Sequence, residues 1–416
     1  MSQVLTGKPL DIFPEPAQEA LPMTLSMNRI SLSRRGFLTS ACCLAAAPVF
    51  TPVAFAAMPG DNRFVTIVLR GAMDGLDLVQ PYGDAGFAAL RPTLALTPET
   101  GLLDLDGHFG LHPAAADLMP LWKNRELAFV HAVSTPYRDQ RSHFDGQDML
   151  ESGGEHVAEE RTGWLNRALA VIPRSDARKA IDVNTSTELI LSGPNEVDVW
   201  ASNSNLAPAR DEMQFLARLY AGDPPFAAAL AEATRADATS MMAEPDGQRG
   251  EKTADVAALA ANMLKGDYRI ASFSITGWDT HIGQAGQFKR PAQDLAQAIN
   301  TLKATLGPEI WAKTVVLAMT EFGRTVRQNG SAGTDHGTGG CALLAGGAIN
   351  GGRILGKWPG LSDGQLLDDR DLMPTADVRE VAAAMLYRQF DVGVGDLTGR
   401  IFPGLGFDKG SQFLKV

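Results

Sequence analysis

The sequence predicts an α/β protein with a mainly parallel central sheet and helices on both faces. Short apolar runs with β-branched residues have the length and composition of strands buried on both faces, and they span residues 64–69, 126–133, 269–275 and 314–319. Stretches with apolar residues at helical spacing lie between several of these runs. Strands that alternate with helices in this way are typical of parallel sheets.

The composition is that of an ordinary globular protein. The chain has 416 residues, 45% hydrophobic and 20% charged, so it can bury a large core. Its net charge of -11 argues against a nucleic-acid partner, because phosphate backbones are held largely by Lys and Arg. Outside the N-terminal region, no apolar run reaches the roughly 20 residues that span a bilayer, so we expect no stable membrane span.

Residues 27–56 have the features of an export signal. Arg34 and Arg35 precede an apolar run over residues 41–50, and Ala54-Phe55-Ala56 follows as a small-x-small cleavage site. This pattern resembles a twin-arginine signal peptide, which implies the twin-arginine translocase as a partner during export. We therefore expect cleavage near Ala56 or Ala57 and a periplasmic or extracellular location.

The signal peptide divides the chain. Residues 1–26 are rich in Pro and polar residues and are interpreted as an extension from a mis-assigned start codon. Residues 57–416 are expected to form a single domain with a helical insertion around 207–250. Of the three cysteines, only Cys341 lies outside the signal, which excludes an intramolecular disulfide there and is consistent with folding before export.

The elements of this domain are predicted in order. The strand at 64–69 ends in a Gly-rich turn that leaves Asp74 near the strand end. The strand at 126–133 runs into residues 137–148, which are too polar for the core. The remaining predictions are an irregular stretch at 102–112, short strands at 180–183 and 341–344, helices at 114–122, 254–264, 291–306 and 376–390, and Ala-rich helical structure at 207–245.

Polar residues follow several of the predicted strands, and in open α/β sheets ligands bind beyond the carboxyl ends of the strands. Together they form a set of carboxylates and imidazoles, a combination that suits a divalent metal such as Zn, Mn or Ca. The set consists of Asp74, Ser142, His143, Asp279, His281, Glu321, Asp335 and His336.

Six motifs in order resemble the bacterial family of unknown function numbered 1501, a distant relative of the alkaline phosphatase and sulfatase superfamily. The motifs lie at residues 74–75, 141–144, 163–167, 277–281, 321–325 and 333–337. The resemblance covers nearly the whole chain after the signal peptide. It implies an alkaline-phosphatase-like fold and a metal-dependent hydrolase of phosphate or sulfate esters.

The resemblance also implies roles for individual residues. Asp74, Asp279, His281, Glu321, Asp335 and His336 are then metal-ligand candidates, and Ser142 or His143 lies where the nucleophile loop follows the second strand. The chain departs from the superfamily pattern twice. Asp279 and His281 are closer in sequence than usual, and Phe322 stands where a His is expected.

In such a hydrolase the cation lowers the pKa of a Ser142 hydroxyl or of water, and Arg141 or Arg324 holds the oxygens of the anionic ester. Formylglycine chemistry does not fit, because Cys341 lies in a predicted strand. The zinc-helix, Walker, nucleophile-elbow and dinucleotide motifs are absent from the sequence.

Each site residue also has a structural interpretation. Asp279-Thr280-His281 fits a turn whose Asp accepts from nearby backbone N–H groups. Glu321 and Arg324 fit an ion pair, Asp335 and His336 a buried pair that orients a Gly-rich loop, and Ser142-His143 a loop that holds strand ends together. His108, His112, His131 and His156 are assigned to structure. A second hypothesis is therefore a non-catalytic envelope protein that binds a polysaccharide, an anionic ligand or a partner protein.

Overall fold

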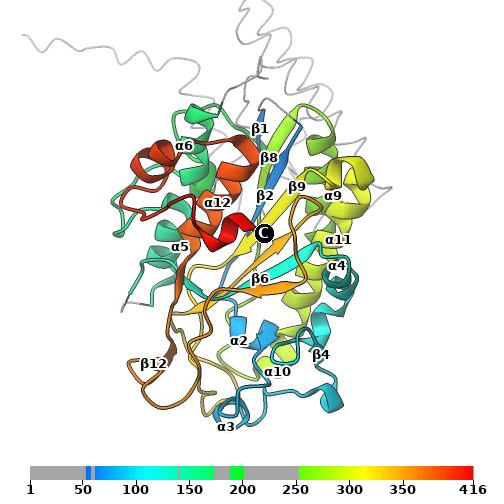
Figure 1. Ribbon diagram of the computed structural model, residues 1–416, viewed down its shortest axis with the longest axis vertical. Helices are drawn as coiled ribbons and strands as arrows, with labels where there is room; N and C mark the ends of the chain where they lie inside the picture. The colour runs from blue at the N-terminus through cyan, green and yellow to red at the C-terminus, as the bar shows by residue number, and fades with distance from the viewer. Residues whose placement is uncertain (1–52, 58–60, 139–140, 173–187, 201–252, 416) are drawn as a thin grey trace, which may run out of the picture. The chain divides into compact units, whose positions relative to one another are not determined.

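The computed structural model describes residues 53–57, 61–138, 141–172, 188–200 and 253–415 (Figure 1). Several sequence predictions lie outside these residues: the upstream extension, the signal peptide as far as residue 52, the strand at 180–183 and the helical insertion around 207–250. Within the described ranges, no helix is both long and apolar enough to cross a membrane.

A central nine-stranded sheet organises the described chain. Strands β9, β2 and β8 pair in parallel, and β10 pairs antiparallel with both β6 and β9, so β6 shares the direction of β9. The predicted α/β class with a mostly parallel sheet is thus confirmed. The strand order is β11 (Arg353–Leu355), β6 (Leu127–Ser134), β10 (Gly340–Ala345), β9 (Thr314–Met319), β2 (Arg63–Leu69), β8 (Tyr268–Ile275), β1 (Val53–Ala57) and β7 (Asp198–Trp200), with β14 (Ala376–Asp377) paired to β6.

Strand β2 shows why the sheet is covered on both faces. All seven of its residues are buried, and successive side chains of a strand point to opposite faces. Val65 and Ile67 belong to one hydrophobic core, whereas Phe64 and Val68 belong to another. Burying a large aliphatic or aromatic side chain contributes about 1.5–3 kcal/mol, so both faces stabilise the strand.

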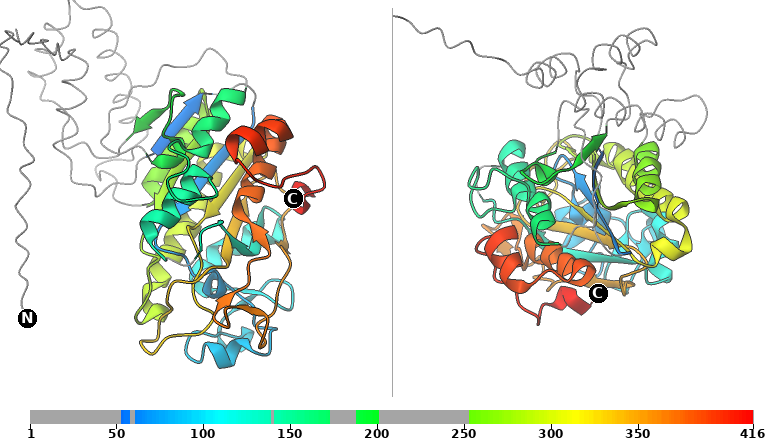
Figure 2. Two further views of the ribbon diagram at one scale, coloured as in Figure 1. Left: turned by 90° about the vertical axis from the view of Figure 1, so that its left-hand side faces the viewer. Right: turned by 90° about the horizontal axis from the view of Figure 1, so that it is seen from above.

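The two cores are built with helices from different parts of the chain (Figures 1 and 2). Helices α9 (Thr253–Lys265) and α11 (Lys289–Trp311) contribute Leu264 and Leu295 to the core that holds Val65. Helices α6 (Trp164–Val171) and α12 (Val378–Phe390) contribute Trp164 and Leu386 to the core that holds Phe64. The sequence therefore predicted the layers correctly.

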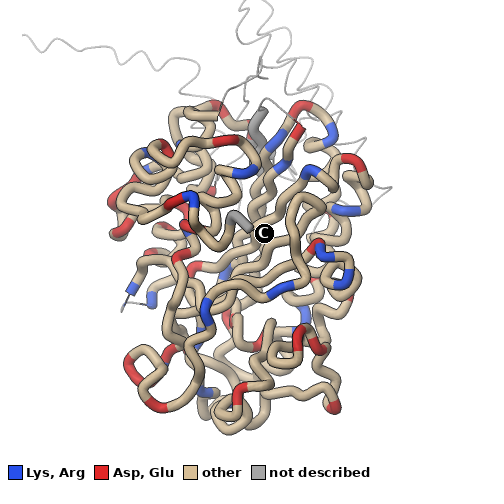
Figure 3. The backbone as a smooth tube through the Cα atoms, viewed as in Figure 1, with Lys and Arg blue, Asp and Glu red and all other residues tan. Residues whose placement is uncertain are grey.

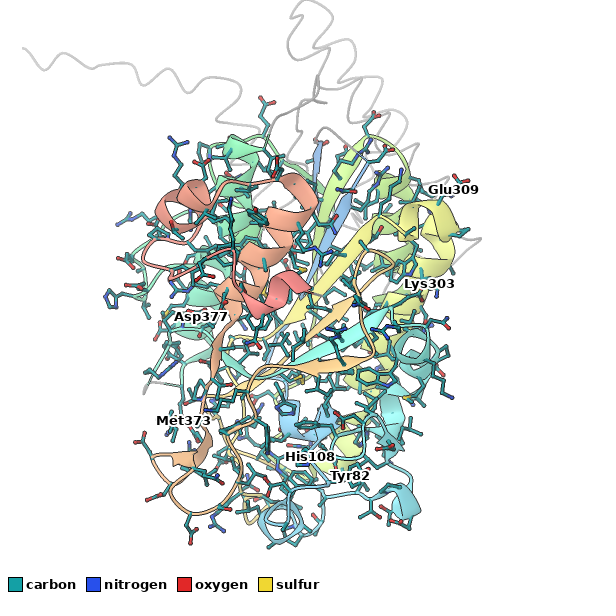
Figure 4. All side chains as sticks on the ribbon, in the orientation of Figure 1. Tyr82, His108, Lys303, Glu309, Met373 and Asp377 are labelled. Atoms are coloured by element: carbon teal, nitrogen blue, oxygen red, sulfur yellow. The ribbon has the colours of Figure 1, made fainter. Side chains whose placement is uncertain are left out.

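Two helix starts differ from the sequence prediction. Residues 376–377 were predicted as helical but form β14, and the Asp377 side chain, labelled in Figure 4, accepts a hydrogen bond from the backbone N–H of Arg379 at the start of α12. The polar stretch at 137–148 was predicted as a loop, yet α5 (His143–Ser152) begins within it, with Ser142 as its N-cap. Polar residues near a helix N-terminus hide the apolar period that marks a helix.

The stretch at 102–112 was predicted to be irregular, but it contains β4 (Leu103–Asp104) and β5 (Gly110–Leu111), which form a small sheet with β3 (Val79–Gln80). The predicted helix at 114–122 is a 3-10 turn over Pro113–Leu118 followed by α4 (Met119–Lys123). The other short elements are α2 (Gly75–Leu78), α3 (Phe87–Leu90), α10 (Gln284–Gln287), α13 (Val394–Asp396), β12 (Leu366–Leu367) and β13 (Asp371–Leu372).

Residues 53–57 form β1, which pairs antiparallel with β8 and with β7. The sequence assigns residues 53–56 to the end of the signal peptide, so cleavage near Ala56 or Ala57 removes this strand from the sheet. The cleavage site stays a prediction. Figure 3 shows acidic and basic residues interspersed along the described backbone.

Candidate metal centre

Five segments of chain meet at one edge of the sheet. The parallel strands β2, β6, β8 and β9 all end there, so the residues that follow them are brought together. Strand β10 runs the opposite way, and its amino end therefore reaches the same edge. This reversal brings in Asp335 and His336, which precede a strand.

The carboxylate of Asp279 is the meeting point of three imidazoles. Its Oδ1 lies 3.0 Å from Nε2 of His281 and 3.2 Å from Nε2 of His336. Its Oδ2 lies 3.5 Å from Nε2 of His143. One ligand atom from each of His143, Asp279 and His336 lies within 4.8 Å of the others, a spacing that suits one metal ion. The Asp279 side chain is 47% exposed, so the cluster is open to solvent.

The other ring nitrogen of each histidine faces an oxygen acceptor. Nδ1 of His143 lies 2.8 Å from Oε1 of Glu321, and Nδ1 of His336 lies 3.0 Å from the carbonyl oxygen of Arg141. Nδ1 of His281 lies 3.5 Å from Oδ1 of Asp335. An ionised carboxylate or a carbonyl oxygen only accepts, so a proton on each Nδ1 leaves the Nε2 lone pairs directed at the centre.

This arrangement fits a cation, because metal-ligating histidines usually donate their other N–H to a carboxylate or carbonyl. A second observation agrees with it. Nε2 of His143 is buried and has no hydrogen-bond partner. Buried polar nitrogens are rarely left without a partner, and a bound ion is one explanation for such a group.

Glu321 lies behind His143. It is fully buried, and besides His143 it accepts from the backbone N–H of Gly71 at 3.0 Å and the hydroxyl of Thr320 at 2.8 Å. Burial opposes its charge, but the hydrogen bond from His143 and these donors hold the Glu321 pKa below its usual value, and Glu321 in turn raises the pKa of His143. The metal-ligand role that the sequence predicts for Glu321 stays a prediction; in the structure its carboxylate accepts from Nδ1 of His143.

The Arg324 side chain is also buried and bonds only other groups of the protein in the described structure. Its guanidinium is buried, bonds Oδ1 of Asp279 at 2.6 Å, and donates to the carbonyls of Gly71, Ala72 and Thr334, and to that of Trp278. Burial opposes the charge of Asp279, but Arg324 holds the Asp279 pKa below its usual value. The substrate-binding role that the sequence predicts for Arg324 stays a prediction; in the structure its donors bond Asp279 and four backbone carbonyls.

Asp74 is not part of the cluster. Its Oδ2 lies 2.6 Å from Nη1 of Arg91, and the two side chains are 1% and 0% exposed. Asp74 also accepts from the backbone N–H of Leu76 and so caps α2. The metal-ligand role of Asp74 stays a prediction, and in the structure its carboxylate forms a buried ion pair with Arg91.

Ser142 and Arg141 lie beside His143. The Ser142 hydroxyl accepts from the backbone N–H of Asp145 as the N-cap of α5. Arg141 has a φ of 52°, in the left-handed region that costs a non-Gly residue roughly 1–2 kcal/mol, and this backbone holds the carbonyl that accepts from His336. The Arg141 side chain is 42% exposed and lies 3.9 Å from Asp371.

Two loops that carry candidate ligands are packed so closely that only Gly fits between them. A Cβ on Gly333 meets the carbonyl of His281, and a Cβ on Gly323 meets the carbonyl of Gly339. The Gly337 N–H also donates to the carbonyl of Gly323 at 2.8 Å. The glycines noted in the sequence around His336 thus allow close approach of the loops.

Sequence reasoning missed a buried polar network beneath the cluster. It contains Gln284, Asp77, Thr280 and Thr334, all with side chains at most 1% exposed. Burial and the charge of Asp74 raise the pKa of Asp77 to about 6. Asp77 carries a weak sequence signal, because it lies three residues from Asp74, whereas nothing in the sequence marks Gln284.

The profile of a family described as "Protein of unknown function (DUF1501)" matches residues 132–398. The matched span includes every residue gathered around Asp279, and Asp74 lies upstream of it. No curated protein and no solved structure matches the chain.

Proposed function

The chain belongs to the DUF1501 family, and from that premise we propose that it is a metal-dependent hydrolase of phosphate or sulfate esters, distantly related to alkaline phosphatases and sulfatases. The candidate ligands are His143, Asp279 and His336, with His281 beside them. One observation carries the proposal: three Nε2 atoms converge on one carboxylate while each Nδ1 faces an acceptor.

The donor set narrows the choice of metal. Imidazole nitrogens with one carboxylate suit Zn or Mn, whereas Ca takes oxygen ligands. We therefore expect Zn or Mn. A bound cation of this kind supplies Lewis acidity to an ester oxygen and lowers the pKa of water.

The protein's own residues hold this site in position. Arg324 and Glu321 fix Asp279 and His143 from the buried side. Arg141 has a half-exposed side chain, and its carbonyl accepts from His336, which supports a role for its guanidinium in binding an anionic ester. The Ser142 hydroxyl is used as a helix cap, which favours water over Ser142 as the attacking group.

Elemental analysis of protein purified without chelator tests the proposal first, followed by hydrolysis of 4-nitrophenyl phosphate and 4-nitrophenyl sulfate. We expect about one equivalent of Zn or Mn, with His336→Ala losing both metal and turnover. His156→Ala, at an exposed histidine that is not part of the cluster, is the matched control and retains both. A wild-type protein that takes up neither metal contradicts the proposal.

A second function is favoured by one observation. Arg324 and Glu321, which a hydrolase could use on substrate, are both spent on internal bonds. These internal bonds are consistent with a non-catalytic envelope protein that binds a polysaccharide, an anionic ligand or a partner protein. Bound metal without turnover of either ester supports this alternative.

We also propose export through the twin-arginine route to the periplasm or beyond. Arg34 and Arg35, the apolar run and the Ala-Phe-Ala site support it. Export of a fusion carrying residues 27–57 is expected to stop when both arginines are replaced by Lys. N-terminal sequencing of the exported chain then shows whether residues 53–56 are removed.

A further inference from the structure

The buried amide of Gln284 joins the two loops that carry the candidate ligands. Its Oε1 accepts from the hydroxyl of Thr280 at 2.9 Å and from that of Thr334 at 2.7 Å. Thr280 lies between Asp279 and His281, and Thr334 immediately precedes Asp335 and His336. One oxygen therefore holds both loops.

The other end of the same amide is anchored to two buried carboxylates. Nε2 of Gln284 donates to Oδ2 of Asp74 and to Oδ2 of Asp77, each at 2.7 Å. Asp74 is held in turn by Arg91, which also donates to the carbonyls of Thr325 and Val326 after β9. The chain of bonds thus runs from the ends of β2 and β9 through Gln284 to both ligand loops.

The geometry points to Gln284 as a positioning residue that sets the distance between the Asp279–His281 loop and the His336 loop, and thereby the affinity of the metal centre. The inference rests on the proposed function. Gln284 is fully buried, and its amide uses two donor and two acceptor bonds. An amide with all its bonds made has one orientation, so the two threonines and the ligands beside them are fixed relative to each other.

The test is Zn affinity, measured by titrating metal-free protein against a chromophoric chelator. Gln284→Met keeps the length of the side chain and removes all four bonds. We expect Zn affinity to fall about 10- to 100-fold, the usual effect of losing a group that orients metal ligands. The absorption spectrum of the Co-substituted protein is expected to change as well, which a loss of stability alone does not produce.

Gln80→Met is the matched control. Gln80 is also fully buried, and its Nε2 donates to Asp77 at 2.8 Å and to the carbonyl of Leu94 at 3.0 Å, but it makes no bond to Thr280 or Thr334. Gln80→Met therefore removes an amide donor from Asp77, as Gln284→Met does, but leaves the bonds to Thr280 and Thr334 intact. Its Zn affinity is expected to stay within about threefold of wild type.

These measurements distinguish failure of the proposed function from failure of the positioning role of Gln284. If wild-type protein binds no Zn or Mn, the proposed function fails. If wild type binds metal and Gln284→Met binds equally well, or Gln80→Met weakens binding as much, the positioning role is wrong. Should Gln284→Met not fold, the double variant Thr280→Val and Thr334→Val carries the same test, because it removes the two hydroxyl bonds to Gln284, together with the long 3.5 Å bond from Thr334 to Asp74, and leaves the Gln284 side chain in place.

Discussion

Nε2 of His281 and Nε2 of His336 lie 3.0 Å apart, and each also lies within 3.2 Å of Oδ1 of Asp279. Two nitrogen lone pairs at this distance repel each other. The contact becomes favourable when a proton or a cation lies between them. We therefore expect the contact between these two imidazoles to depend on whether a cation is bound.

Metal is therefore expected to raise the melting temperature. A ligand at 100 times its dissociation constant stabilises the folded state by about 2.7 kcal/mol. Differential scanning fluorimetry with added Zn or Mn measures the shift. His281→Ala and His336→Ala are expected to lose most of it, whereas a shift of wild-type size in both variants argues that the ion binds elsewhere.

Arg324→Lys is expected to destabilise the protein by about 3–5 kcal/mol, since an ammonium replaces neither the planar fork nor all of the donors that reach buried oxygens. Urea unfolding measures the change. Arg290→Lys, at a side chain 88% exposed, is the control and should stay within about 0.5 kcal/mol of wild type. Equal stability of the two variants contradicts the role given to Arg324.

Glu151, which is not one of the candidate ligands, is expected to make the stability of the fold depend on pH. It lies 2.8 Å from Arg70, but burial, with the neighbouring Glu188, raises its pKa from 4.5 to about 7. Between these values the folded protein keeps a proton that the unfolded chain loses, so this group lowers stability as the pH rises from about 4.5 to about 7.

Glu151→Gln removes that part of the slope, worth about 1.4 kcal/mol for each unit of pKa shift. Urea unfolding at pH 5 and pH 8 should show stability falling less with pH in the variant than in wild type. Glu309→Gln, an exposed change on α11 (Figure 4), should keep the wild-type slope. A variant slope equal to that of wild type means that Glu151 is already ionised at pH 5.

Gly333→Ala is expected to disturb the candidate centre, because the added Cβ meets the backbone carbonyl and carbon of His281. A backbone atom cannot rotate away, so the His336 loop must shift, at a cost of about 1–3 kcal/mol. Thermal unfolding and Zn titration measure the two effects. Gly395→Ala, where nothing lies within 4 Å of the added Cβ, is the control; a Gly333→Ala protein that matches it would show that the loops have slack.

The strands and the ligand candidates could be predicted because their signals are local. Apolar runs marked β2, β6, β8 and β9, and polar residues directly after them marked Asp279 and His281. The partners of those residues could not be predicted. Whether Glu321 binds a metal or orients His143, and whether Asp74 meets a cation or Arg91, depends on contacts between segments up to 250 residues apart, such as Gly71 with Glu321.

The direction of β10 could not be predicted from the sequence either. Its short apolar run predicted a strand, but a run of apolar residues carries no information on whether the strand is parallel or antiparallel. The antiparallel pairing with β6 and β9 explains why His336, upstream of the strand, joins residues that lie downstream of theirs. Pairing direction depends on the whole sheet and not on residues 340–345.

Cys341 lies in β10, between β6 and β9, and is 1% exposed. Burial raises the pKa of its thiol and keeps it un-ionised. An alkylating reagent can therefore reach it only when the middle of the sheet separates. Peptide mass spectrometry of the alkylation rate at Cys341 thus measures that opening at a residue the chain already carries.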